Sequence, residues 1–150
     1  MNPSKKIHIQ PIGYVKRESA DEDVKDKSLI SVIVIKMEHE EALDGLEEFS
    51  HLLVISWLHK ITDTDKCSLK IHPRGRLDLP LTGVFATRSP KRPNPIGLTL
   101  VKLVKRERNI LWVEGLDAFH DTPILDIKPF DRWDTAESFR VPKWMPMNCK

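Results

Sequence analysis

The sequence predicts a mainly β protein: a small single-domain β-barrel or β-sandwich with one short helix and an irregular C-terminal tail. Three observations predict this fold. The 150 residues suit one domain, with a core over about residues 7–130 and a tail over residues 131–150. Eleven prolines stand against six glycines, and only one segment has a helical apolar pattern. Several short segments are rich in β-forming residues, without the alternating helices that a doubly wound parallel sheet requires.

The first quarter of the chain supplies two predicted strands. Residues 7–15 contain β-forming side chains interrupted by Pro11 and Gly13, a pattern typical of an edge strand or a bulged strand. Residues 17–27 are mostly charged and predict an exposed loop. Residues 29–36, LISVIVIK, are rich in β-branched side chains and predict a buried strand.

A short helix is expected over residues 38–49, where apolar residues recur at three- and four-residue spacing among acidic ones. The segment is short and contains Gly45, so two or three turns are expected. Residues 50–60 then predict a strand. Because side chains alternate along a strand, one face of it is expected to carry His51, Leu53, Ile55, Trp57 and His59.

The second half of the chain begins with a polar, turn-rich segment over residues 63–78. A strand is expected over residues 82–88, and residues 98–106 and 110–116 predict a hairpin with a short loop at residues 107–109. A last short strand is expected over residues 124–127. The tail has little periodicity.

Composition and motifs exclude several classes of protein. No apolar run approaches the roughly 18 residues of a membrane-spanning helix, and the polar N-terminus predicts no secretory signal. Cys67 and Cys149 cannot form a disulfide framework or a four-thiolate zinc site, and the histidines lack zinc-ligand spacing. The glycine-rich loops of common nucleotide-binding proteins are missing from the sequence. We therefore expect a cytoplasmic protein with no membrane segment and no metal.

The net charge of +2 conceals a segregation of charge. Between Lys66 and Arg108 there are eleven Lys or Arg residues and two acidic residues, a balance of 11 − 2 = +9, so the remainder carries 2 − 9 = −7. This basic window predicts an anionic partner. The alternative is that these charges are scattered, solvated and never share a face.

The segment GVFATRSPKRPNPIG, residues 83–97, contains prolines at positions 90, 93 and 95. Each proline fixes its own φ angle and biases the preceding residue toward extended geometry, so this proline loop is expected to be stiff before any ligand arrives. Its cations Arg88, Lys91 and Arg92 suit phosphate or carboxylate, and the Asn94 amide can donate and accept hydrogen bonds. The alternative is a linker or a polyproline ligand, but the loop lies between two apolar strands.

The segment AFHDTPILDIKPF, residues 118–130, surrounds a Thr-Pro turn with carboxylates. Asp121 can bind ribose hydroxyls or lie near a cationic centre; alternatively, it caps its own turn. Asp126 lies in an otherwise apolar strand, where an unpaired carboxylate would be costly. We therefore expect it to pair with Lys128 or with an arginine of the proline loop.

Two strings in this order, GVFATRSPKRPNPIGLTLVKL and GLDAFHDTPILDIKP, closely resemble the TsaA/TrmO-like family. The stretches PIGYV and GLEEFSHLLVISWLHK also fit, so the resemblance covers most of residues 9–130. Members of this family include S-adenosyl-L-methionine-dependent methyltransferases of the β-barrel type that act as homodimers on tRNA. The resemblance implies methylation of N6 of threonylcarbamoyl-adenosine next to the anticodon, with tRNA as the partner.

Carried over residue by residue, the resemblance implies a cofactor site formed by His59, Lys60, Arg88, Leu98, Asp121, Thr122, Pro123 and Ile124. Four further residues match strongly patterned family positions and are expected to serve catalysis: Arg92, Asn94, Asp126 and Lys128. Residues 18–27 lack the Pro-Arg-Gln-like segment that contributes to the cofactor pocket in many members. This departure favours the alternative of a non-catalytic β-barrel that binds RNA or an adenosine-like ligand.

Overall fold

The computed structural model describes residues 6–18 and 21–145, which form two compact units. The first unit contains the described residues up to 60 together with residues 95–130, and the second contains residues 61–94 and those from 131 onward. Cys149 and the last five residues of the predicted tail lie outside the described residues. The expectation of a single domain over the whole chain stays a prediction.

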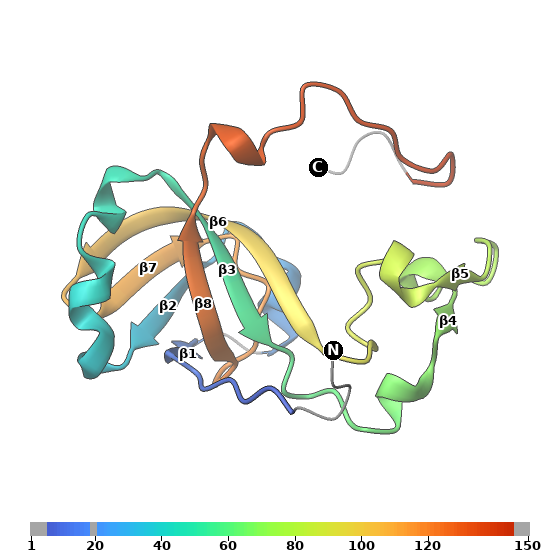
Figure 1. Ribbon diagram of the computed structural model, residues 1–150, viewed down its shortest axis with the longest axis horizontal. Coiled ribbons are helices and arrows are strands. Elements are labelled where there is room, and N and C mark those ends of the chain that lie inside the picture. Colours follow the sequence, from blue (N-terminus) through green and yellow to red (C-terminus); the bar gives the residue numbers. More distant parts are fainter. Residues whose placement is uncertain (1–5, 19–20, 146–150) are drawn as a thin grey trace. The chain divides into compact units, whose positions relative to one another are not determined.

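Six antiparallel strands of the first unit close into a barrel in the order β1-β2-β7-β6-β3-β8 (Figure 1). The strands are β1 (Gly13–Lys16), β2 (Ile30–Ile35), β3 (His51–Trp57), β6 (Ile96–Glu107), β7 (Ile110–Glu114) and β8 (Pro123–Pro129). Every strand of the described barrel therefore has a neighbour on both sides, which satisfies the backbone hydrogen bonds. The mainly β barrel predicted from the sequence is confirmed.

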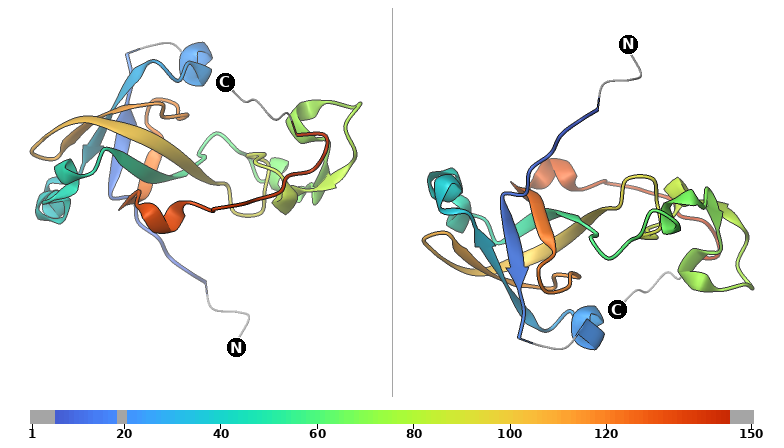
Figure 2. Two further views of the ribbon diagram at one scale, coloured as in Figure 1. Left: turned by 90° about the horizontal axis from the view of Figure 1, so that it is seen from above. Right: turned by 90° about the horizontal axis from the view of Figure 1, so that it is seen from below.

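The barrel core is filled by alternating inward-facing side chains. On β3 these are Leu52, Val54 and Ser56, whereas the alternate residues from His51 to Trp57 face outward, as predicted. His59, expected on the same face, lies beyond the end of β3 in a turn. The other core residues come from the remaining five strands of the barrel and from adjoining segments: Val15, Ile33, Ile35, Leu43, Val101, Leu111, Val113, Leu116, Ala118 and Ile124. Figure 2 shows from two further sides how the strands curve around this core.

The helix expected over residues 38–49 forms as two 3₁₀ segments, η2 (Met37–Leu43) and η3 (Leu46–Glu48). Gly45 lies between them with a φ of +85°, a left-handed conformation that interrupts a continuous helix. Leu43 still packs against the barrel core. The position of the helical region is therefore as predicted, but its hydrogen-bond pattern is not that of a single α-helix.

The second unit contains a two-stranded sheet of β4 (Lys70–Ile71) and β5 (Thr82–Gly83). Its described 3₁₀ segments are η4 (Asp65–Cys67), η5 (Pro73–Gly75), η6 (Val84–Ala86) and η7 (Arg132–Asp134). The strand expected over residues 82–88 ends at Gly83. The Val84 carbonyl accepts hydrogen bonds from the Thr87 backbone N–H at 3.1 Å and from its hydroxyl at 2.8 Å, which turns the chain there.

Candidate functional site

The acidic turn predicted from the sequence lies at one end of the barrel, immediately before β8. The Phe119 carbonyl accepts a hydrogen bond from the Thr122 N–H at 3.2 Å, and Asp121 between them has a φ of +60°. The Asp121 N–H donates to the Val15 carbonyl at 2.8 Å, and the Val15 N–H donates to the Thr122 carbonyl at 3.0 Å. Hydrogen bonds to β1 therefore fix this cofactor turn, residues 119–122, and its Asp121 side chain is exposed.

Of the two predicted cofactor residues that follow β3, Lys60 contacts the same turn. His59 and Lys60 are both exposed. Lys60 Nζ lies 4.0 Å from the centroid of the Phe119 ring, a cation–π geometry. Two segments that the resemblance assigns to the cofactor therefore meet at this end of the barrel.

The other residues assigned to this part of the site are less accessible. Thr122 is 2% exposed and Ile124 is fully buried, while Pro123 is half-buried. The Ile124 side chain belongs to the barrel core. A ligand at the turn can therefore meet the backbone of these residues and the side chain of Asp121.

A second group of predicted residues lies on the outer face of the barrel. The strand register places Leu98 of β6 opposite Ile55 of β3, and Ile55 opposite Asp126 of β8. Strands in a sheet lie about 4.8 Å apart, so Leu98 and Asp126 are separated by roughly 10 Å on this face. Asp126 Oδ2 lies 2.9 Å from Lys128 Nζ, and the Asp126 side chain is 46% exposed. One of the two partners expected for this carboxylate is therefore found, and the carboxylate is not buried.

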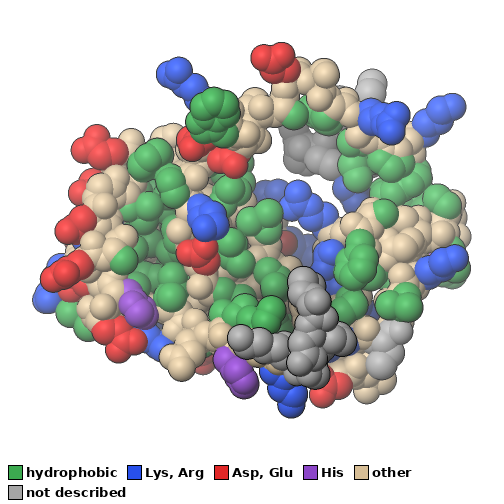
Figure 3. Space-filling model, in the orientation of Figure 1, with side chains coloured by type: hydrophobic (Ala, Val, Ile, Leu, Met, Phe, Trp, Pro, Cys, Tyr) green, Lys and Arg blue, Asp and Glu red, His purple; other side chains and the backbone are tan. Residues whose placement is uncertain are grey.

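The outer face of β6 is apolar and exposed. Its outward-facing apolar residues keep between 39% and 49% of their surface exposed: Ile96, Leu98, Leu100 and Val104. Figure 3 shows apolar side chains gathered over β8, β3 and β6, with charged groups among them. The sequence alone did not indicate this exposed stripe.

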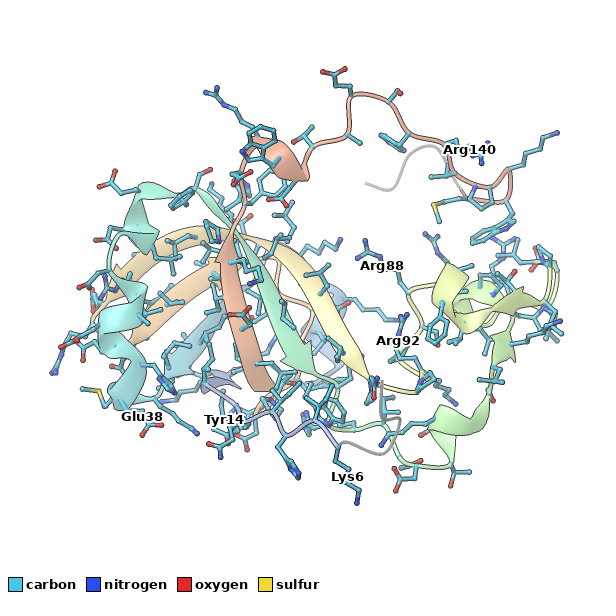
Figure 4. All side chains as sticks on the ribbon, viewed as in Figure 1. Lys6, Tyr14, Glu38, Arg88, Arg92 and Arg140 are labelled. Atoms are coloured by element: carbon cyan, nitrogen blue, oxygen red, sulfur yellow. The ribbon has the colours of Figure 1, made fainter. Side chains whose placement is uncertain are left out.

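An open pocket of about 360 Å³ lies beside the cofactor turn, on the outer side of β1 and β2. It is lined by Tyr14, Val15, Lys16, Val34, Ile35, Lys36, His120 and Asp121. Tyr14 keeps 42% of its surface exposed and is labelled in Figure 4. The pocket therefore combines an aromatic ring, two cations and the predicted cofactor residue Asp121.

In the second unit, the proline loop is held by its own hydrogen bonds. The Arg92 guanidinium donates to the carbonyls of Thr87 at 3.4 Å and Ser89 at 3.3 Å, and the Arg92 N–H donates to the Pro90 carbonyl at 2.9 Å. Arg92 therefore stabilises the loop that carries it. Arg88 is exposed, and no described residue gives its side chain a hydrogen bond or an ion pair (Figure 4).

The rest of the proline loop is linked to the segment after β3. Lys91 Nζ lies 3.1 Å from Asp65 Oδ1, and the Thr62 hydroxyl donates to Asp65 Oδ2 at 2.8 Å. The Thr62 hydrogen bond and then the Lys91 contact lower the pKa of Asp65 from 3.8 to about 2. Asn94 is exposed.

The basic window is partly neutralised within the molecule. Ion pairs join several of its cations to acidic residues: Lys66 to Asp63, Arg76 to Asp78, Lys91 to Asp65, Lys105 to Glu107, Arg106 to Asp44 and Glu47, and Arg108 to Glu40. Among the described residues, Lys70, Arg88, Arg92 and Lys102 of this window have no such pair. The charge available to an anionic partner is therefore smaller than the count from the sequence.

One buried residue near the turn was missed by the sequence prediction. The exposed loop expected from residue 17 onward is wrong for Arg17, which is 8% exposed. Gly13 and Val15 face inward, so the two-residue alternation of β1 continues to this position. Extending that alternation by one step would have predicted an inward-facing arginine.

Among the described residues, no helix is long and apolar enough to cross a membrane. The same part of the chain contains no group of three or more His, Cys, Asp or Glu side chains that could hold a metal ion.

A closed antiparallel barrel, with candidate ligand residues at its strand ends and on an outer strand face, defines a small ligand-binding β-barrel protein. The sequence identifies the family within this class of protein. The chain belongs to the family described as tRNA-methyltransferase O N-terminal domain, whose model matches residues 16–134. The family that the motifs resembled is therefore confirmed.

Curated relatives and solved structures agree with this family. A probable S-adenosyl-L-methionine-binding protein of Methanocaldococcus jannaschii is 44% identical over 124 residues, which cover 82% of this chain and 91% of the relative. The human tRNA (adenine(37)-N6)-methyltransferase is 50% identical over 104 residues, which cover 69% of this chain and 23% of the human protein.

Two crystal structures of TrmO share the fold. One has a TM-score of 0.73 at 29% identity, covering 95% of this chain and 65% of the TrmO chain. The other, from Pseudomonas aeruginosa, has a TM-score of 0.69 at 28% identity, covering 91% of this chain and 62% of the TrmO chain. This chain thus spans less than two thirds of the TrmO chains and less than a quarter of the human protein.

Proposed function

We propose that this protein is an S-adenosyl-L-methionine-dependent methyltransferase that acts on N6 of threonylcarbamoyl-adenosine next to the tRNA anticodon. Its family and the names of its human and archaeal relatives support the cofactor and the reaction. The observation that carries the proposal is the contact of Lys60 with Phe119. It brings together two chain segments that were assigned to the cofactor independently of any structure.

The side chains in the barrel unit fit the chemistry of this cofactor. S-adenosyl-L-methionine supplies an electrophilic methyl group on a sulfonium, which adjoins an adenosine and an amino-acid portion. The exposed Asp121 carboxylate can accept hydrogen bonds from ribose hydroxyls, and Leu98 offers apolar surface to a purine ring. Arg88 stays a proposed cofactor residue, because an exposed guanidinium suits a carboxylate.

The chain's contribution to methyl transfer is mainly alignment. Holding the acceptor amine in line with the bond that breaks supplies much of the rate of such a reaction. Asp126 is a half-exposed carboxylate that can accept the proton lost by the amine, and Lys128 holds its orientation. Arg92 is proposed to act by ordering the proline loop, and the exposed Asn94 amide by hydrogen bonding to the acceptor.

We also propose that the protein is a homodimer that works on tRNA in the cytoplasm. The exposed apolar stripe of β6 is a suitable interface, because a two-fold dimer buries the same patch of both copies. Leu100→Glu is expected to give a monomer in sedimentation velocity, and an unchanged dimer would exclude this face.

A second candidate function is binding without catalysis. The archaeal relatives are named for S-adenosyl-L-methionine binding alone, and the segment after β1 lacks the Pro-Arg-Gln-like motif. A non-catalytic barrel would bind RNA or an adenosine-like ligand at the same turn.

Transfer of a methyl label from S-adenosyl-L-methionine to tRNA separates the two functions. The proposed enzyme transfers the label, whereas a binding protein retains the cofactor or tRNA without transfer. Arg88→Ala is expected to abolish transfer while the thermal unfolding midpoint is unchanged. Arg140→Ala is the matched control, because Arg140 is an exposed arginine of the same unit (Figure 4). Undiminished transfer by Arg88→Ala would remove the assigned role of Arg88.

A further inference from the structure

Arg17 is a buried cation next to the cofactor turn. It follows the last residue of β1, and its side chain faces inward like that of the buried Val15. A buried charge is costly unless polar groups solvate it. The Arg17 guanidinium therefore needs hydrogen-bond acceptors within the protein.

The Arg17 guanidinium donates to backbone carbonyls from two separate segments. Its Nη1 atom lies 3.3 Å from the carbonyl oxygens of both Leu116 and Ala118, which precede the cofactor turn. Its Nη2 atom lies 3.3 Å from the carbonyl oxygen of Asp23 in the 3₁₀ segment η1 (Asp21–Lys25). A planar guanidinium holds several acceptors in fixed directions, whereas a lysine ammonium is a compact charge on a flexible stem.

The backbone of Arg17 contacts the turn itself. Its N–H donates to Nδ1 of His120 at 3.2 Å, which makes Nδ1 the acceptor and places the proton of a neutral ring on Nε2. His120 Nε2 lies 3.4 Å from Asp121 Oδ1. The orientation of the Asp121 carboxylate is thus linked through His120 to the position of Arg17.

We propose that Arg17 is a positioning residue for the cofactor turn. Its guanidinium fixes the Leu116 and Ala118 carbonyls, its N–H orients His120, and together these hold Asp121 ready for S-adenosyl-L-methionine. A turn that is ordered in advance loses less conformational entropy when the ligand binds. The inference rests on the proposed function for its cofactor, and it assigns the order of the turn to a residue outside the motifs that carry the resemblance.

The first test uses Arg17→Lys without ligand and measures amide hydrogen exchange. The Asp121 and Thr122 amides, which donate within the turn and to β1, are expected to exchange about tenfold faster. The Val54 amide in the barrel core should keep its rate. Arg108→Lys is the matched control, because this exposed arginine of the same barrel pairs with the Glu40 carboxylate and should leave the turn unchanged.

The second test measures S-adenosyl-L-methionine binding by calorimetry. Arg17→Lys is expected to lower the affinity about tenfold. Ethylguanidinium should partly restore the affinity of Arg17→Ala, whereas ethylammonium at the same concentration should not. If Arg17→Lys does not fold, Arg17→Gln retains two N–H donors without the charge and takes its place.

The outcomes separate this inference from the proposed function. Unchanged exchange at Asp121 and Thr122 overturns the positioning role, and so does faster exchange with undiminished cofactor affinity. If the wild-type protein itself fails to bind S-adenosyl-L-methionine, the proposed function fails and the cofactor role of Arg17 fails with it. In that case the exchange rates still decide whether Arg17 orders the turn.

Discussion

Lys60 Nζ and the Phe119 ring centroid lie 4.0 Å apart, and this contact joins the end of β3 to the turn before β8. The sequence separates these residues widely, and the antiparallel pairing of β3 with β8 brings them to one end of the barrel. The candidate site in the barrel unit depends on this pairing. Its consequences can be measured one at a time.

Replacing Phe119 by leucine keeps an apolar side chain but removes the aromatic face under Lys60. A cation–π contact at an exposed site contributes about 0.5–1 kcal/mol. Without it the ligand must order the two segments itself, so S-adenosyl-L-methionine affinity should fall by at most this amount, about two- to fivefold. Calorimetry measures this change. Phe49→Leu, at another partly exposed aromatic of the barrel unit, is the control. Equal affinities of Phe119→Leu and wild type would show that the contact does not shape the site.

The Asp65 carboxyl is predicted to titrate at low pH. Its folded-state pKa of about 2 lies below the ordinary aspartate value of 3.8, so the ionised form favours the folded state. The resulting stabilisation is present above pH 3.8 and is lost as the pH falls toward 2. Carbon-13 NMR of the carboxyl group measures the midpoint directly.

Two variants separate the causes of this shift. Thr62→Val should raise the Asp65 pKa more than Lys91→Met, because the Thr62 hydroxyl makes the largest contribution. Arg88→Met, on the same loop but without a contact to Asp65, should leave the midpoint where it is. A larger effect of Lys91→Met than of Thr62→Val would contradict this order.

Any side chain at position 97 is expected to destabilise the barrel, because the space next to Gly97 is already filled. A Cβ atom at this position would lie 2.6 Å from Ser56 Oγ and 3.0 Å from a Leu58 methyl carbon. Gly97→Ala should therefore reduce the free energy of unfolding by about 1–3 kcal/mol, as measured in urea. Adding Ser56→Ala should recover part of the loss, because the two side chains collide.

Gly83→Ala provides the control, since nothing lies within 4 Å of a Cβ atom there. An equal loss at both glycines would mean that contact with Ser56 is not the cause.

The salt dependence of tRNA binding should distinguish available cations from neutralised ones. On the proposed function, Lys70→Gln removes one phosphate contact and reduces the slope of log K against log salt by about 1. Lys105→Gln should change the slope less, because Lys105 is paired with Glu107 at 2.9 Å. Identical slopes for the two variants would argue against a contribution of Lys70.

The strands could be predicted from local pattern because each is buried on one face or rich in β-branched residues. The segments assigned to β2, β3, β6 and β7 all form close to their expected bounds. The form of the helical region could not be predicted. An apolar helical pattern is compatible with a glycine at position 45, but the left-handed conformation of Gly45 separates the region into two segments. The strand expected from residue 7 begins only at Gly13, where the residue-by-residue registers with β2 and β8 start.

The candidate site was predicted less completely, because its chemistry depends on contacts between distant residues. The motifs indicated the cofactor turn, but not that Thr122 and Ile124 are buried. The basic window was overestimated because Arg106 pairs with Asp44 and Glu47, which come from the helical region before β3. No local pattern in the sequence reports such partners.

Mass spectrometry of tRNA nucleosides from cells that lack this protein tests the central claim most directly. The proposed function predicts that one species, N6-methylated threonylcarbamoyl-adenosine, disappears and that the unmethylated nucleoside accumulates. The wild-type gene should restore the methylated species, and an Arg88→Ala gene should not. An unchanged nucleoside profile would contradict the assignment of a methyltransferase.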